Sequence, residues 1–231
     1  LLRGDRSSTR YDVSFGTVLT VGDLDGDRRA DLVVASSEPG DGGAGSISSC
    51  AGTAGGLTTC TQLARDSALV GPTSVAVGNV RGDTNPEIVV GVPGLRQDRE
   101  DGGTVQILTV PGPTQGAVER YELTQDSKGV PGSDEDGDLF GYSVALGALD
   151  NDRYADLVIG APGEDVGSKK DAGRVTVVYG NDTLPYSSDE SRIYDRGTKG
   201  VPGSAGKDDS FGDEVSLVDH DGDGHLDLTV G

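Results

Sequence analysis

Residues Phe140–Gly163 decide the fold, and they read FGYSVALG, then ALDNDRYAD, then LVIGAPG. The first and last of these segments are short apolar runs that contain β-branched residues, and an acidic run separates them. Glycine or proline recurs every few residues, and no stretch keeps the period of about 3.6 residues that marks an amphipathic helix. The pattern therefore predicts two β-strands connected by an acidic turn.

The same arrangement recurs along the chain. Each of the three phenylalanines precedes a glycine, and an acidic run begins eight residues after each of them. Phe140 and Phe211 are 71 residues apart, as are two copies of KGVPG at Lys128–Gly132 and Lys199–Gly203. In a weaker copy, Gly71 stands where phenylalanine is expected. Four units therefore begin near residues 15, 71, 140 and 211, and the fourth ends just after its acidic run.

Each full unit contains four short segments that are typical of β-strands. Repetition of such units predicts an all-β fold, namely a β-propeller built from four-stranded blades. We interpret residues 1–231 as a single propeller region with three complete repeats and a truncated one. The expected strands are Thr73–Gly78, Ile88–Gly91, Thr104–Val110 and Val118–Leu123 in the second unit, and Tyr142–Gly147, Leu157–Gly160, Arg174–Tyr179 and Ser191–Tyr194 in the third.

The acidic runs have the composition of metal-binding loops. Aspartates at positions 1, 3, 5 and 9 of a nine-residue loop bring like charges together, and a bound cation relieves their repulsion. Ca²⁺, which takes roughly six to eight oxygen ligands, fits better than Mg²⁺. Glycine at position 4 allows the tight turn, and position 7 is expected to offer its backbone carbonyl. The predicted ligands are Asp23, Asp25, Asp27, Arg29 and Asp31 in the first loop, Asp150, Asp152, Tyr154 and Asp156 in the third, and Asp219, Asp221, Asp223, His225 and Asp227 in the fourth.

The four loops are not equivalent. The first and fourth have all four carboxylates and predict strong sites, whereas Ala148 at position 1 predicts a weaker third site. The second loop, Asn79–Glu87, has Arg81 at position 3, and we expect its guanidinium to pair with Asp83 and Glu87 in place of an ion. An acidic surface turn without metal is the alternative to the metal sites. An EF-hand is excluded, because it needs a glutamate at position 12 and a helix on either side, whereas position 12 here is apolar.

The composition of the chain argues against a nucleic-acid-binding protein and against a membrane-spanning helix. The chain has 231 residues and a formal net charge of −20, which argues against binding to nucleic acid. No apolar run approaches the roughly 20 residues of a membrane-spanning helix. Methionine is absent, so we expect a processed product or a fragment of a longer protein.

Two cysteines, Cys50 and Cys60, flank a stretch rich in glycine, serine and threonine. A bond between them would close a short loop and favour an oxidising, secreted or extracellular setting. Two unpaired thiols are the alternative. No CxxC motif accompanies them, so a zinc or redox site is unsupported.

The third unit resembles an FG-GAP repeat, as found in the amino-terminal propeller of integrin α-subunits and in secreted bacterial proteins. Its Phe-Gly, acidic loop and Gly160-Ala-Pro occur in that order, and the second unit keeps Gly91-Val-Pro, whereas the first has Ala35-Ser-Ser. The resemblance implies a propeller, usually of seven blades, with calcium loops in hairpins on one face and ligand contacts more often on the other. We therefore expect this region to be about half of a larger propeller. A second chain that completes the ring, or a smaller ring, is the alternative.

These features predict a non-catalytic, calcium-binding extracellular module for binding or adhesion to a protein or carbohydrate partner. The rival interpretations are an accessory propeller of a larger secreted enzyme and a carboxylate-dependent glycosidase or lyase. Both histidines lie in the fourth acidic loop, so a Ser-His-Asp arrangement is unsupported. Two RGD tripeptides, Arg3–Asp5 and Arg81–Asp83, are attributed to chance. The candidate contact loops are Ser37–Gly45, Pro93–Gly103 and Pro162–Gly173, with the linkers Gly129–Leu139 and Gly200–Ser210.

Overall fold

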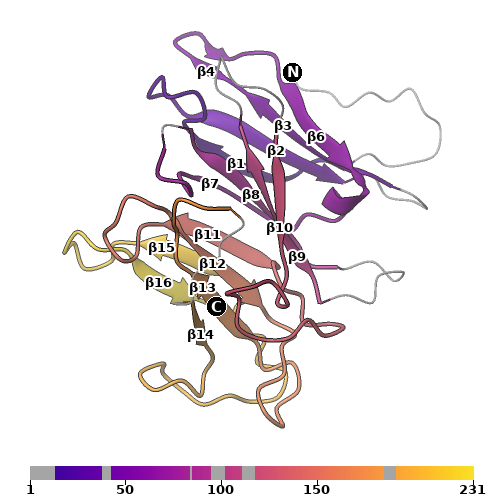
Figure 1. Ribbon diagram of the computed structural model, residues 1–231, viewed down its shortest axis with the longest axis vertical. Helices are drawn as coiled ribbons and strands as arrows, with labels where there is room; N and C mark the ends of the chain where they lie inside the picture. The colour runs from indigo at the N-terminus through magenta and orange to yellow at the C-terminus, as the bar shows by residue number, and fades with distance from the viewer. Residues whose placement is uncertain (1–13, 38–42, 84, 95–101, 111–117, 185–190) are drawn as a thin grey trace.

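The protein is nearly all-β. A computed structural model describes residues 14–37, 43–83, 85–94, 102–110, 118–184 and 191–231. Within these ranges the only helical element is one short 3-10 turn, η1 (Ser67–Leu69). The strands form antiparallel sheets that follow one another from the N-terminal to the C-terminal end of the molecule (Figure 1).

Three of the sheets have four strands, and neighbouring strands in each sheet follow one another in the described chain apart from a small hairpin inside the first. This arrangement confirms the prediction of four-stranded blades, including all eight strands expected in the second and third units. The first sheet consists of β1 (Ser14–Gly22), β2 (Asp31–Ser37), β3 (Gly45–Cys50) and β6 (Thr61–Asp66), the second of β7 (Ser74–Gly78), β8 (Glu87–Val92), β9 (Thr104–Thr109) and β10 (Arg120–Leu123), the third of β11 (Ser143–Gly147), β12 (Asp156–Ala161), β13 (Arg174–Val178) and β14 (Arg192–Tyr194), and the fourth of β15 (Val215–Val218) and β16 (Asp227–Val230).

The first strands of successive units pack against each other in the order β1, β7, β11, β15. Glycines make this approach possible. A Cβ atom at Gly22 would lie 2.5 Å from a methyl group of Val77 in β7, and one at Gly147 would lie 3.1 Å from a methyl group of Leu217 in β15. Apolar side chains of the facing sheets form shared cores between them, so the sheets stack as blades do.

The Phe-Gly and Gly-Ala-Pro motifs meet where one blade packs on the next. A Cβ atom at Gly91 would lie 1.9 Å from the carbonyl oxygen of Gly141, and one at Gly160 would lie 2.0 Å from that of Gly212. Each contact therefore joins the second strand of one blade to the Phe-Gly of the following blade. Phe140 itself is fully buried in the core between the second and third sheets.

A small hairpin interrupts the first unit between β3 and β6, which the sequence did not predict. It consists of β4 (Gly52–Thr53) and β5 (Gly56–Leu57), and a disulfide between Cys50 and Cys60 closes its base. The N–H of Gly52 donates a hydrogen bond to Oδ1 of Asp31 at 2.7 Å. The expected disulfide is therefore confirmed, and the hairpin that it closes contacts the first acidic loop.

Loss of this disulfide is expected to lower stability without removing the fold. Closing a loop of about ten residues restricts the unfolded chain and is worth roughly 3 kcal/mol. The double variant Cys50→Ser/Cys60→Ser should therefore show a lower denaturant midpoint with an unchanged far-ultraviolet circular dichroism spectrum. A midpoint equal to that of the wild type under oxidising conditions would contradict this expectation.

Candidate metal centres

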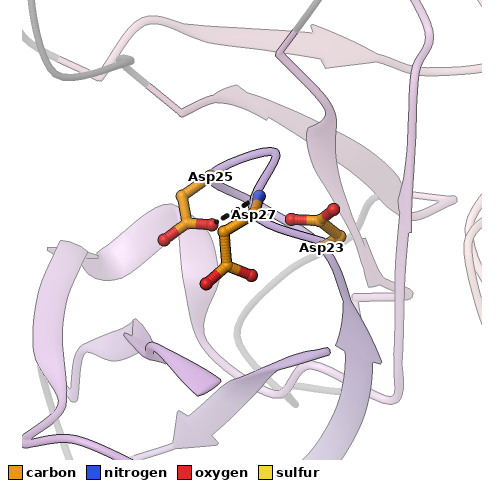
Figure 2. Close-up of side chains that lie close together, drawn as sticks. All are labelled: Asp23, Asp25 and Asp27. Atoms are coloured by element: carbon orange, nitrogen blue, oxygen red, sulfur yellow. Dashed lines mark hydrogen bonds between the residues drawn. The ribbon is translucent and has the colours of Figure 1, made fainter. Parts of the chain in front are cut away.

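The acidic loops connect the first strand of each unit to the second, at the tip of a hairpin. In the first loop the carboxylates of Asp23, Asp25 and Asp27 gather round the turn between β1 and β2 (Figure 2). Corresponding groups form in the third and fourth loops, and each residue offers an oxygen within 4.8 Å of those of the other two. The three groups are Asp23, Asp25 and Asp27, then Asp150, Asp152 and Asp156, then Asp219, Asp221 and Asp227.

The same backbone hydrogen bonds shape the three loops. The N–H at position 5 donates to the carboxylate at position 3 at 3.1 Å, and the N–H at position 7 donates to the carboxylate at position 5 at 2.8 Å. Position 4 has a positive φ in every unit, at 78° for Gly26 and Gly222 and at 63° for Asn151. The expected tight turn is present, and asparagine adopts it where glycine is missing.

The carboxylate at position 9 ties the loop to its blade. Asp156 is fully buried, and it accepts hydrogen bonds from the N–H groups of Leu149, at 2.6 Å, and Gly180, at 2.9 Å. Asp31 similarly accepts from Leu24 and Gly52, both at 2.7 Å. Asp156 also stands in its acidic group, whereas Asp31 does not join the group of the first loop. Position 9 therefore has a structural role that the sequence pattern did not reveal.

Position 7 was expected to contribute only its backbone carbonyl. In the first loop the guanidinium of Arg29 forms a salt bridge with Asp27, with Nη1 at 2.7 Å from Oδ2, and the role of its backbone carbonyl stays a prediction. The hydrogen bond from Arg29 lowers the pKa of Asp27. In the fourth loop Nδ1 of His225 lies 2.9 Å from Nδ2 of Asn151 in the third loop, so neighbouring acidic loops are in contact on one face of the molecule.

The second loop differs as its sequence suggests. Nε of Arg81 lies 3.8 Å from Oδ2 of Asp83, which agrees with the predicted internal pair. Glu87 accepts instead from the backbone N–H groups of Val80, at 3.0 Å, and Arg81, at 3.4 Å. Burial raises the pKa of Glu87 to about 7. The RGD tripeptide of this loop packs against its neighbour, since a Cβ at Gly82 would lie 2.6 Å from the ring of Tyr154.

The donor chemistry of the first, third and fourth loops fits a hard cation. Each group presents three carboxylates at a hairpin tip, and oxygen ligands of this type suit Ca²⁺ rather than a metal that prefers nitrogen or sulfur. The carboxylates outside the three groups, Asp31 and Asp223, belong to the same loops. Among the described residues, the second loop forms no comparable acidic group.

A second polar cluster lies at the opposite end of the strands, where the linker before β11 meets the connection between β12 and β13. Gln125, Asp138 and Glu164 are all buried. Nε2 of Gln125 donates to Glu164 at 2.6 Å, and the other carboxylate oxygen of Glu164 pairs with Arg174. Burial, with the adjacent Glu164 carboxylate as a second cause, raises the pKa of Asp138 to about 7. Sequence patterns could not have indicated this cluster, because its members are far apart in the chain.

The raised pKa of Asp138 predicts a pH-dependent contribution to stability. Because the folded protein binds the Asp138 proton more tightly than the unfolded chain does, this proton stabilises the fold. The stabilisation is complete below the unfolded pKa of 3.8 and is lost as the pH rises through about 7. Asparagine cannot lose this proton, so the melting temperature of Asp138→Asn minus that of the wild type should increase from pH 5 to pH 8. Both proteins are measured in EDTA, with the exposed Asp136→Asn as the control; a constant difference across this pH range would contradict the assignment.

The candidate contact loops are only partly described. Residues 38–42 of Ser37–Gly45, residues 95–101 of Pro93–Gly103 and the tripeptide Arg3–Asp5 lie outside the described residues. No helix among the described residues has the length and hydrophobicity needed to cross a membrane. The buried pair Asp138 and Glu164 is held by internal hydrogen bonds, unlike a pair of carboxylates that faces a substrate cleft.

Comparison with known proteins agrees with the repeat pattern. The sequence model of the FG-GAP repeat matches residues 15–49 and 140–178, so the chain carries FG-GAP repeats in its first and third units. A phosphatidylinositol-glycan-specific phospholipase D from Bos taurus is 35% identical over 92 residues, which are 39% of this chain and 11% of that protein. The Rattus norvegicus protein of the same name is 34% identical over 93 residues, again 39% and 11%. The match thus spans about a tenth of the length of these relatives.

Proposed function

We propose that this chain, with its FG-GAP repeats, is a calcium-binding, non-catalytic module of an extracellular protein that presents its loops to a protein or carbohydrate partner. The observation that carries the proposal is that three hairpin loops share the same backbone hydrogen bonds and each brings three carboxylates together. The strands hold these tips in series, and a cation at each tip would hold the hairpin loop closed. The surface for a partner is the other face, which the linkers and the connections between second and third strands form.

Calcium titration tests the proposal directly. Isothermal titration of metal-free protein should detect Ca²⁺ binding that Asp25→Ala and Asp221→Ala each reduce by one site. Asp83→Ala, in the loop with the internal arginine pair, should leave the number of sites unchanged. Absence of calcium binding to the folded wild type, or equal loss in all three variants, would refute the assignment.

A second candidate function is that of an accessory module in a larger secreted enzyme. The observation in its favour is that the matched relatives carry the name of an enzyme, although the match covers only about 10–11% of their length. Under this proposal the isolated chain should not release a phosphatidylinositol-glycan-anchored reporter from vesicles. Release that a carboxylate substitution abolishes would overturn the non-catalytic assignment.

A further inference from the structure

The disulfide-closed hairpin of the first unit lies directly against the first acidic loop. Gly52, the second residue after β3, donates its N–H to Oδ1 of Asp31 at 2.7 Å. A Cβ atom at Gly52 would lie 2.2 Å from the carbonyl oxygen of Ala30, the residue before Asp31. The backbone of the hairpin therefore packs on the loop so closely that no side chain fits at this point.

The third unit makes the same contact without a disulfide. Gly180, the second residue after β13, donates its N–H to Oδ1 of Asp156 at 2.9 Å. A Cβ atom at Gly180 would lie 2.8 Å from the carbonyl oxygen of Ala155, the residue before Asp156. In both units a glycine after the third strand thus holds the carboxylate at position 9 of the acidic loop.

Strand register shows that the two contacts are equivalent. The residue directly after the position-9 carboxylate pairs with the last residue of the third strand, as Leu32 does with Cys50 and Leu157 does with Val178. The donor glycine follows two residues later in each unit. Cys50 therefore stands at the point where the chain leaves the third strand to make this contact, and the first unit adds a covalent bond there.

The carboxylate of Asp31 joins the beginning of the first loop to the hairpin. Its side chain is buried, and Oδ2 accepts a hydrogen bond from the N–H of Leu24, at position 2 of the loop, at 2.7 Å. Oδ1 accepts from Gly52. Because a buried carboxylate oxygen without a donor is costly, the loop depends on the hairpin staying in place.

Apart from the disulfide, few interactions hold the hairpin together. β4 and β5 have two residues each, and the N–H of Thr58 donates to the carbonyl oxygen of Ala51 at 2.8 Å. A short two-stranded hairpin is marginally stable by itself. The bond from the fully buried Cys50 to Cys60 closes the base of the hairpin and keeps Gly52 beside the loop.

We propose that the Cys50–Cys60 disulfide positions the first acidic loop for calcium, so that reduction of the disulfide weakens this site and leaves the third and fourth loops unaffected. The inference rests on the proposed function, because it requires the acidic loops to bind Ca²⁺. Groups that orient the ligands of a metal without touching it typically change metal affinity by about 10- to 100-fold. Linkage is reciprocal, so Ca²⁺ opposes reduction of the disulfide by the same factor.

Reduction proceeds by thiol–disulfide exchange, with glutathione as the reductant. A glutathione thiolate attacks one cysteine sulfur, a mixed disulfide forms, and the other cysteine leaves as a thiolate that takes up a proton. A second glutathione thiolate attacks the mixed disulfide, releases the remaining cysteine and forms glutathione disulfide. Two electrons thus pass from two glutathione molecules to Cys50 and Cys60, and the covalent closure of the hairpin is lost.

Calcium titration of loop-specific backgrounds tests the proposal on the full chain. With Asp152→Ala and Asp221→Ala, the first loop alone keeps its full acidic group among the three. Replacing Cys50 and Cys60 with serine in this background should weaken Ca²⁺ binding by about tenfold or more. With Asp25→Ala, which leaves the third and fourth loops, the same replacement should leave affinity unchanged. Circular dichroism checks that each variant is folded at the titration temperature.

A second variant moves the hairpin without removing the disulfide. In the background that retains the first loop, Gly52→Ala places a Cβ against Ala30 and should weaken Ca²⁺ binding to a similar extent. Gly55→Ala, in the same hairpin, is the matched control. A Cβ at Gly55 would come no closer than 3.8 Å to the hydroxyl oxygen of Thr53, and affinity should not change.

The reciprocal effect is measured in glutathione redox buffers. Excess Ca²⁺ should shift the equilibrium toward the disulfide by about tenfold or more in the wild type and should have no effect in Asp25→Ala. Equal affinity of the first loop with and without the disulfide would overturn this inference alone. An equal loss in the Asp25→Ala background would overturn it too, since the effect would then be a general loss of stability. Absence of calcium binding in every variant and the wild type would instead refute the proposed function, and this inference with it.

Discussion

Replacing Phe140 with alanine is expected to lower the free energy of unfolding by about 3–5 kcal/mol, which is the usual cost of removing a fully buried phenylalanine. Phe140 has no exposed surface, and its ring lies in the core that joins the second and third sheets. The substitution therefore removes apolar contacts from two blades at once. Denaturant unfolding followed by circular dichroism measures the change.

The other two Phe-Gly motifs provide matched controls in the same sequence context. Phe211 is 6% exposed and borders an apolar cavity between the third sheet and the β15–β16 hairpin, so Phe211→Ala should lower the free energy of unfolding by less than Phe140→Ala. Phe15 is 40% exposed, and Phe15→Ala should cost less again, below about 1 kcal/mol. A similar cost in all three variants would show that the motif acts through the turn rather than through burial of the ring.

Chelation of divalent ions is expected to lower the free energy of unfolding by an amount similar to that of Phe140→Ala. A ligand that binds only the native state stabilises it by about 2.7 kcal/mol per site when its free concentration is 100-fold above the dissociation constant. Two complete loops would then contribute roughly 5 kcal/mol under these conditions. Melting curves in EDTA and in excess Ca²⁺ measure the difference, which should shrink on acidification because the ligand carboxylates must be ionised.

Variants of single loops test whether the effect comes from the acidic groups. Asp25→Ala and Asp221→Ala should each lower the melting temperature in excess Ca²⁺ but have little effect in EDTA. Asp83→Ala should have the same effect on the melting temperature in both conditions, because we expect no ion in the second loop, where Arg81 lies 3.8 Å from Asp83. A melting curve of the wild type that EDTA leaves unchanged would refute the calcium assignment.

The fold could be predicted from the sequence because its signals are local and repeated. Phe140 and Phe211 set the register of the units, and the apolar runs on either side of each acidic loop became β11, β12, β15 and β16. Gly91 and Gly160 are needed because a backbone carbonyl oxygen lies about 2 Å from where their Cβ atoms would be, and the glycines of the Phe-Gly motifs, Gly16, Gly141 and Gly212, have positive φ angles. A requirement of this kind leaves a trace in the copies where blades pack this closely, although Ala35 stands at the equivalent position of the first unit.

The features that could not be predicted depend on contacts across long sequence separations. Asp31 belongs to the acidic pattern, yet its partner Gly52 lies in a hairpin with no repeat signal. Asp138 and Glu164 meet only because the linker before β11 packs on the connection after β12. Neither the spacing of residues nor the composition of the chain predicts such long-range contacts.

The serial packing of the first strands, β1 on β7, β7 on β11 and β11 on β15, has a consequence for the dynamics of the chain. The two middle sheets are flanked on both sides, whereas the described residues flank the first sheet and the β15–β16 hairpin on one side only. In a polypeptide that consists of residues 1–231 alone, local opening should therefore begin at the first sheet and the β15–β16 hairpin and spread inward. Amide hydrogens of β8, β9, β12 and β13 should exchange with solvent most slowly, and those of β1 and β16 most rapidly.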